Sequence, residues 1–215
     1  MISVTEYKPQ EEVLEFLEKC QSVYIIGCGS CTTITHTGGK AEVLKMKESL
    51  AETGKEITGW MVIPTACDEL ARDALKEAGD EIQSADCLLI MTCAFGVQNI
   101  AMFTGKPVFP ALNTIFIGKE QTTPGLFSEV CRQCGDCVLA WTGGICPVVS
   151  CSKGLLNGPC GGTDEGKCEV DSDKDCAWTL IYNRLKDQGR LDLFDKEQPP
   201  KHYQSGTRPG KITIQ

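Results

Sequence analysis

The chain has 215 residues, enough for one large domain or for a medium domain with a small one. Hydrophobic residues make up 41% of it, enough to form a core, so disorder throughout is excluded. The formal net charge of −8, with no basic stripe, argues against binding to nucleic acid or to anionic membranes. We find no apolar run long enough to span a membrane and no signal peptide, and therefore expect a cytoplasmic protein.

Cysteine is the most informative residue type in this sequence. The 14 cysteines lie at positions 20, 28, 31, 67, 87, 93, 131, 134, 137, 146, 151, 160, 168 and 176. In a reducing compartment, thiols at this density indicate metal binding rather than disulfides. Aromatic residues make up only 7% of the chain, so we expect bound metal to supply part of the stability.

The first part of the chain, residues 1–118, alternates predicted strands and helices. We expect a helix after Pro9, a strand at 23–26, a helix at 38–53, a strand at 60–63, a helix at 68–78 with Asp68 as its cap, a strand at 88–91, a short helix at 97–102 and a strand at 107–109. This order predicts an α/β fold with a parallel sheet and right-handed crossovers, either Rossmann-like or flavodoxin-like.

The second part is expected to fold differently. Residues 119–195 are predicted to form a small, irregular, cysteine-rich iron–sulfur domain that its ligands hold together, because glycine and cysteine dominate and periodicity is weak. Residues 176–188 predict a helix with Trp178, Ile181 and Leu185 on one face. Residues 196–215 predict an extended C-terminal tail, either free or laid along a partner.

Four cysteines follow the ends of three predicted strands. Cys28 and Cys31 follow the first strand, Cys67 follows the second, and Cys93 follows the third. Because the carboxyl ends of parallel strands meet at one edge of a sheet, loops there can bring the four thiolates together. Four thiolates are the ligand set of a cubane iron–sulfur cluster. The glycines on either side of Cys28 let backbone N–H groups approach the sulfurs of such a cluster.

Three other interpretations of this segment stay open. Gly27 and Gly29 resemble part of a dinucleotide-binding loop, although the third glycine and the acidic residue are absent. Cys28 and Cys31 have the spacing of a thioredoxin-like redox pair. The four thiolates would also suit zinc.

Three further residues with metal-binding side chains are expected to have other roles. Cys20 ends the first predicted helix and Cys87 begins a buried strand, so we expect both to pack as small hydrophobic side chains. His36 lies between two threonines, and we expect a loop histidine bonded to the backbone.

A C-x2-C-x2-C run lies in the second part of the chain. Its members, Cys131, Cys134 and Cys137, can bind three corners of a cubane while a distant cysteine binds the fourth. Five more cysteines follow: Cys146, Cys151, Cys160, Cys168 and Cys176. Eight thiols suffice for two clusters, or for one cluster and a zinc site. Our working partition joins the run to Cys176 and groups the other four, but spacing alone does not decide it.

Long motifs in this part resemble a known family. They are the Cys131–Cys137 run, the segments Thr142–Pro147 and Lys153–Gly162, and Cys176–Trp178. These segments resemble the methylenetetrahydrofolate reductase C-terminal domain. With Gly27–Cys31 and Cys67, they make residues 22 to about 190 similar to the MetV family. Members of that family are iron–sulfur subunits that pair with the flavin subunit MetF in acetogenic bacteria.

The resemblance implies an iron–sulfur electron-transfer subunit with no catalytic residue of its own. The implied partner is a MetF-like flavin subunit, which reduces methylenetetrahydrofolate to methyltetrahydrofolate in the Wood–Ljungdahl pathway of anaerobes, and a larger redox complex is an implied donor. The implied cofactors are two to three [4Fe–4S] clusters, with zinc in place of one as an alternative. The implied ligands are Cys28, Cys31, Cys67, Cys93, Cys131, Cys134, Cys137, Cys146, Cys151, Cys160, Cys168 and Cys176.

Two hypotheses from other classes stay open on the residues alone. One is a zinc-stabilised structural or interaction module, which metal content would distinguish from an electron carrier. The other is a thiol–disulfide redox protein that uses Cys28 and Cys31. We find no acid–base pair and no complete nucleotide-binding motif that would indicate another enzyme class.

Overall fold

The structure, a computed structural model, describes residues 2–206 and 208–210. The chain divides into two compact units, Met1–Phe127 and Ser128–Gln215. The finer division expected at residues 118 and 195 stays a prediction. Among the described helices, none has the length and apolar character that crossing a membrane requires.

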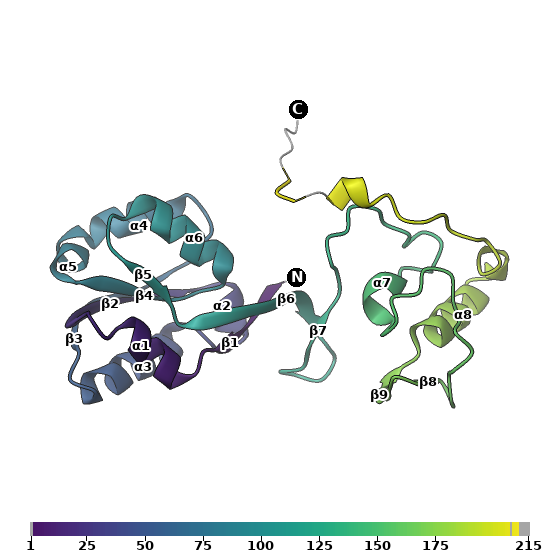
Figure 1. Ribbon diagram of the computed structural model, residues 1–215, viewed down its shortest axis with the longest axis horizontal. Helices are drawn as coiled ribbons and strands as arrows, with labels where there is room; N and C mark the ends of the chain where they lie inside the picture. The colour runs from purple at the N-terminus through teal and green to yellow at the C-terminus, as the bar shows by residue number, and fades with distance from the viewer. Residues whose placement is uncertain (1, 207, 211–215) are drawn as a thin grey trace. The chain divides into compact units, whose positions relative to one another are not determined.

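The first unit alternates strands and helices, as the sequence predicts (Figure 1). Its strands are β1 (Ile2–Tyr7), β2 (Ser22–Cys28), β3 (Glu56–Ile63), β4 (Cys87–Met91), β5 (Val108–Pro110) and β6 (Leu112–Glu120). Its helices are α1 (Gln10–Phe16), α2 (Cys31–Ile34), α3 (Lys40–Glu52), α4 (Leu70–Glu77), α5 (Gly79–Ser84) and α6 (Ala94–Phe103).

Four strands form the central sheet in the order β3-β2-β4-β5. All three neighbouring pairs are parallel. Cys28 at the end of β2 lies opposite Ile63 at the end of β3, so these two strands finish level with each other. The sheet confirms the predicted α/β fold. When its strands are numbered in sequence order they run 2-1-3-4, which is the order of flavodoxin-like proteins, whereas Rossmann folds run 3-2-1-4.

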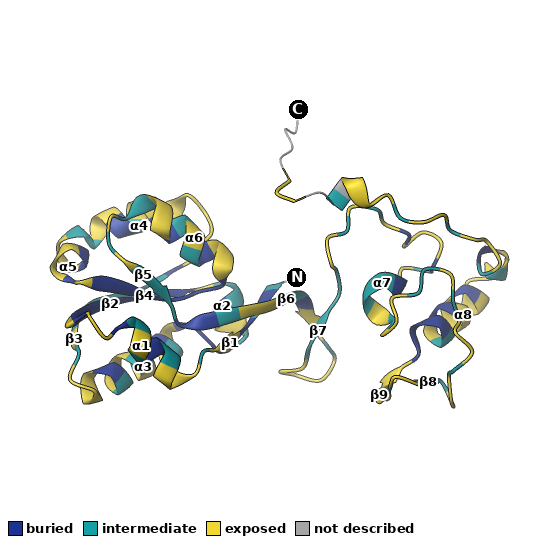
Figure 2. Cartoon of the chain, in the orientation of Figure 1, coloured by how far each residue is buried: buried dark blue, intermediate teal, exposed yellow. Residues whose placement is uncertain are grey.

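Helices cover both faces of this sheet, with α1 and α3 on one side and α4, α5 and α6 on the other (Figure 1). Side chains along a strand alternate between the faces. Val23 and Ile25 therefore join the core under α1 and α3, whereas Tyr24 and Ile26 join the core under α4, α5 and α6. The central strands β2 and β4 are buried at every residue (Figure 2).

A second sheet of the order β1-β6-β7, with β7 at Phe127–Glu129, was not predicted. β1 and β6 pair in antiparallel fashion, with Ile2 opposite Gly118 and Tyr7 opposite Leu112. Two strands from distant parts of the sequence pair with each other here, which no local pattern reveals.

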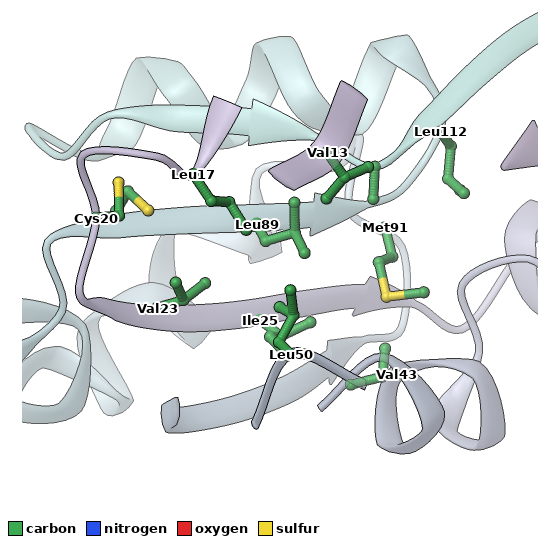
Figure 3. Close-up of a cluster of buried hydrophobic side chains, with 12 residues drawn as sticks. Val13, Leu17, Cys20, Val23, Ile25, Val43, Leu50, Leu89, Met91 and Leu112 are labelled. Carbon is green, nitrogen blue, oxygen red and sulfur yellow. The ribbon is translucent and has the colours of Figure 1, made fainter. Parts of the chain in front are cut away.

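Cys20 and Cys87 lie in the core beneath α1 and α3, as predicted. Figure 3 shows Cys20 beside Leu17 and Val23. Cys87 is fully buried, and this burial, together with a hydrogen bond and the charge of Cys20, raises the pKa of the Cys87 thiol far above its usual range. His36 lies in a turn with an exposed side chain 3.9 Å from Glu42, which agrees with a loop histidine.

The second unit has little regular structure and a small core. Its elements are α7 (Pro147–Ser150), β8 (Lys167–Cys168), β9 (Asp171–Asp175), α8 (Ala177–Asp187) and the 3-10 helices η1 (Leu191–Leu193) and η2 (Tyr203–Gly206). The predicted helix at 176–188 is thus confirmed as α8. Its inner face packs Ile181 and Leu185 into the core, and the ring of Trp178 meets that of Phe194 edge-on at 5.8 Å.

Candidate metal centres

The four strand-end cysteines gather at the carboxyl edge of the parallel sheet. Cys28 ends β2, Cys31 begins α2, Cys67 lies in the turn after β3, and Cys93 directly precedes α6. Partial burial raises the pKa of Cys67, and negative charge on Cys93, Cys28 and Cys31 raises it further. Such charges act appreciably only over short distances, so the four thiols surround one region of the molecule.

Hydrogen bonds join the loop after β2 to the turn after β3. The backbone N–H of Gly29 donates to the carbonyl of Ile63 at 2.8 Å. The Ser30 hydroxyl donates to the carbonyl of Pro64 at 2.7 Å and lies 3.0 Å from the Thr65 hydroxyl. These bonds fix the loop that carries Cys28 and Cys31 against the turn that leads to Cys67.

Thr32 joins the ends of β2 and β4. Its side chain is fully buried, and its hydroxyl lies 3.1 Å from the carbonyl of Cys28 and 3.3 Å from that of Met91. Gly38 packs so closely on the Met91 carbonyl that a Cβ there would collide with it. The segment after β2 is therefore held against the strand that leads to Cys93.

Asn99 on α6 holds the turn that carries Cys67. Its side-chain amide donates to the carbonyl of Ala66 at 3.0 Å and to that of Asp68 at 2.8 Å. These two carbonyls belong to the residues on either side of Cys67. The side chain of Asn99 thus fixes the position of this exposed cysteine relative to α6, which Cys93 caps.

We expect Thr32→Val to loosen this edge of the sheet. Valine keeps the shape of threonine but leaves the buried Met91 carbonyl without this donor, a loss of about 1–3 kcal/mol. Hydrogen exchange of the β2 and β4 amides would show the loss as faster exchange. Thr122→Val, at an exposed position, is the matched control and should leave exchange unchanged. Equal protection in both variants would contradict this role of Thr32.

Several of the predicted ligands lie at helix N-termini. Cys93 is the N-cap residue of α6, Cys146 that of α7, and Cys176 that of α8. The free N–H groups at a helix start favour the thiolate form of a neighbouring cysteine. At Cys176, burial raises the pKa, but hydrogen bonds from Thr179, Thr163 and the Trp178 backbone together outweigh it, and the net pKa is lowered.

The C-x2-C-x2-C run lies on a loop whose backbone turns around its thiols. Gln133 and Gly135 adopt positive φ values of 53° and 79°. The backbone N–H of Gln133 donates to the Cys131 sulfur at 3.2 Å. A backbone hydrogen bond from Asp136 lowers the pKa of Cys134. N–H groups directed at sulfur are the outer-shell contacts that stabilise metal-bound thiolates.

A further group of cysteines gathers around an ion pair. The Cys160 thiol donates to the Glu169 carboxylate at 3.4 Å, and that carboxylate pairs with Lys153. The hydrogen bond that Lys153 donates to Glu169 raises the pKa of Lys153, and charges on Cys160 and Cys168 raise it further. The charge on Cys176 acts in turn on Cys168. The structure therefore places Cys176 near Cys168, whereas our working partition joined Cys176 to the C-x2-C-x2-C run.

The loop that carries Cys160 lies on α8. The indole N–H of Trp178 donates to the carbonyl of Leu155 at 3.1 Å. Gly158 packs directly on the indole ring, where any Cβ would collide with it. Cys151 packs against the same core, which also contains Cys176. Contacts with one aromatic side chain thus hold the Lys153–Gly162 segment against α8.

Thiols are gathered in these places without forming a compact cage. Among the described residues, no group of three or more His, Cys, Asp or Glu side chains lies close enough together to hold one metal ion. The donor sets are nonetheless thiol-rich and supplied with N–H donors.

These features define the class of protein: an α/β unit with four thiols at its sheet edge, followed by a cysteine-rich unit. Residues 109–204 match the family described as methylene-tetrahydrofolate reductase C terminal. This region contains eight of the 14 cysteines, and the match confirms there the resemblance found in the sequence. No curated protein and no solved structure matches the chain.

Proposed function

We propose that the chain is the iron–sulfur electron-transfer subunit of a methylenetetrahydrofolate reductase. In this proposal it passes electrons to a MetF-like flavin subunit, which reduces the folate substrate in the Wood–Ljungdahl pathway of an anaerobe. The observation that carries the proposal is the family match of the cysteine-rich region, 109–204. A larger redox complex as electron donor and a cytoplasmic location belong to the same proposal.

Clusters and zinc require different separations of their four cysteine sulfurs. Four sulfurs bound to one zinc ion at about 2.3 Å are only about 3.8 Å from one another. In a cubane each cysteine binds a different iron, so the four sulfurs lie further apart. The C-x2-C-x2-C spacing of Cys131, Cys134 and Cys137 is typical of cubane ligands and supports assigning clusters. When bound, [4Fe–4S] clusters supply one-electron transfer.

We propose three ligand sets. The first is Cys28, Cys31, Cys67 and Cys93 at the sheet edge. The second is Cys151, Cys160, Cys168 and Cys176 around α7 and α8. The third is Cys131, Cys134 and Cys137, with Cys146 as the remaining thiol. The electrostatic interaction of Cys168 with Cys176 supports moving Cys176 into the second set. The other residues around these sites supply hydrogen bonds and charge, and the folate chemistry is assigned to the partner.

The direct test is the content of iron, zinc and acid-labile sulfide per chain after anaerobic purification, with EPR of the reduced protein. We expect about twelve irons with matching sulfide, as three cubanes require. About eight irons with one zinc would retain electron transfer and make one site structural. Zinc without sulfide would contradict the proposal and support a zinc-stabilised interaction module.

A further inference from the structure

The C-terminal tail contacts the loop that carries the C-x2-C-x2-C run. The Lys201 ammonium donates to the backbone carbonyl of Asp136. The next residue, His202, donates its backbone N–H to the Asp136 carboxylate at 3.1 Å. Further along, the Arg208 guanidinium donates to the carbonyl of Gln133 at 2.7 Å. Three contacts from separate tail residues thus reach two residues that lie between the cysteines.

The Lys201 ammonium also faces one of the thiols. The Cys134 sulfur lies 3.9 Å from the same Asp136 carbonyl that accepts the Lys201 hydrogen bond, so the ammonium and the thiol meet at one backbone group. Gly206 lies against Cys134, since a Cβ there would come within 3.2 Å of the Cys134 carbonyl. The tail therefore brings a positive charge and close backbone packing to the middle cysteine of the run.

Lys201 differs in this respect from Lys153, the lysine beside the other cysteine group. Lys153 forms an ion pair with Glu169, which compensates its charge. Lys201 donates to a neutral backbone carbonyl, while the carboxylate of Asp136 accepts the backbone N–H of His202. The hydrogen bond of Lys201 to Asp136 thus goes to a neutral group, whereas that of Lys153 goes to a carboxylate.

We propose that Lys201 is a positioning and tuning residue of the site formed by Cys131, Cys134 and Cys137. Its hydrogen bond holds the loop in the ligating conformation, and its charge stabilises the reduced site. The inference rests on the proposed function, because it takes the occupant to be an iron–sulfur cluster. One-electron reduction adds one negative charge, so a nearby ammonium favours the reduced form and raises the reduction potential.

The test uses the full chain, purified anaerobically with its clusters. Lys201→Gln keeps a hydrogen-bond donor but removes the charge, Lys201→Met removes both, and Lys201→Arg restores the charge. EPR-monitored redox titration should show a lower midpoint potential for one cluster in the Gln and Met variants. We expect iron release to a chelator to be roughly tenfold faster in the Met variant, at the lower end of what loss of an outer-shell partner costs. Arginine should restore both properties.

Lys186→Gln on α8 is the matched control, since it removes one positive charge from an exposed position of the same unit. It should change neither the potential nor iron release. Iron-loaded Lys201→Met protein with unchanged potentials and release would overturn this inference and leave the proposed function standing. An equal shift of every cluster would also overturn it. A native chain without iron and sulfide would overturn the proposed function itself.

Discussion

The double variant Cys28→Ser/Cys31→Ser is expected to lose one complete cluster, about four irons per chain, while the sheet stays folded. Serine is close to cysteine in size, but it lacks the thiolate that binds iron. Cys28 ends β2 and is one member of the core under α4, α5 and α6, whereas Cys31 belongs to neither core cluster. The other packing of β2 comes from Val23 to Ile26, which the double variant leaves unchanged. Iron and sulfide analysis after anaerobic purification measures the loss, and hydrogen exchange of β2 and β4 reports on the fold.

Cys20→Ser is the matched control for this experiment. It makes the same chemical change at a buried cysteine that lies in the core beneath α1 and α3, away from the proposed ligands. We expect it to retain all of its iron. A double variant that kept its iron but lost redox activity would contradict the strand-end cluster and support the thiol–disulfide hypothesis for Cys28 and Cys31.

The parallel sheet could be predicted because its signals are local. Each of its strands is a short apolar run, and the helices between them carry apolar residues at helical spacing. The topological rule then places Cys28, Cys67 and Cys93 at one edge, and the structure brings them together there. β1 and β6 were missed because their pairing partners lie far apart in the sequence.

The remaining parts of the site depend on the fold and leave no signal in the sequence. Cysteine spacing identifies candidate ligands, but Thr32, Asn99 and Lys201 are ordinary polar residues until the fold directs them at particular carbonyls. The start of α4 likewise differs from the start that the sequence predicts. Asp68 was expected as its cap, whereas α4 begins at Leu70 and the Asp68 carboxylate accepts the Leu70 N–H at 3.0 Å.

The spacing of the eight C-terminal cysteines along the chain likewise does not decide which of them bind the same cluster. The separations of these cysteines along the chain are compatible with many groupings, because the segments between them are irregular. The grouping of Cys160 and Cys168 around the Lys153–Glu169 pair depends on where the loop before α8 turns back. That turn is set by packing on Trp178, which is a tertiary contact.

Removal of the clusters is expected to unfold the second unit and leave the first unit folded. In the described part of the chain, the first unit has two core clusters of twelve buried residues each, whereas the second has one cluster of five. Metal binding in small irregular domains supplies folding free energy directly, about 10–16 kcal/mol for structural zinc in short peptides. The second unit resembles such domains in its few buried apolar side chains.

Hydrogen exchange before and after anaerobic chelation of the iron measures this effect unit by unit. We expect the amides of α8 to lose protection by a factor of at least about a hundred, since each 1.4 kcal/mol corresponds to a factor of ten. The amides of β2 and β4 serve as the internal control and should keep their protection, because their packing involves no proposed ligand except Cys28. Unchanged protection of α8 would mean that Trp178, Ile181 and Leu185 suffice to fold the unit. The cysteines around α8 would then act only as ligands, and the clusters would make no contribution to its stability.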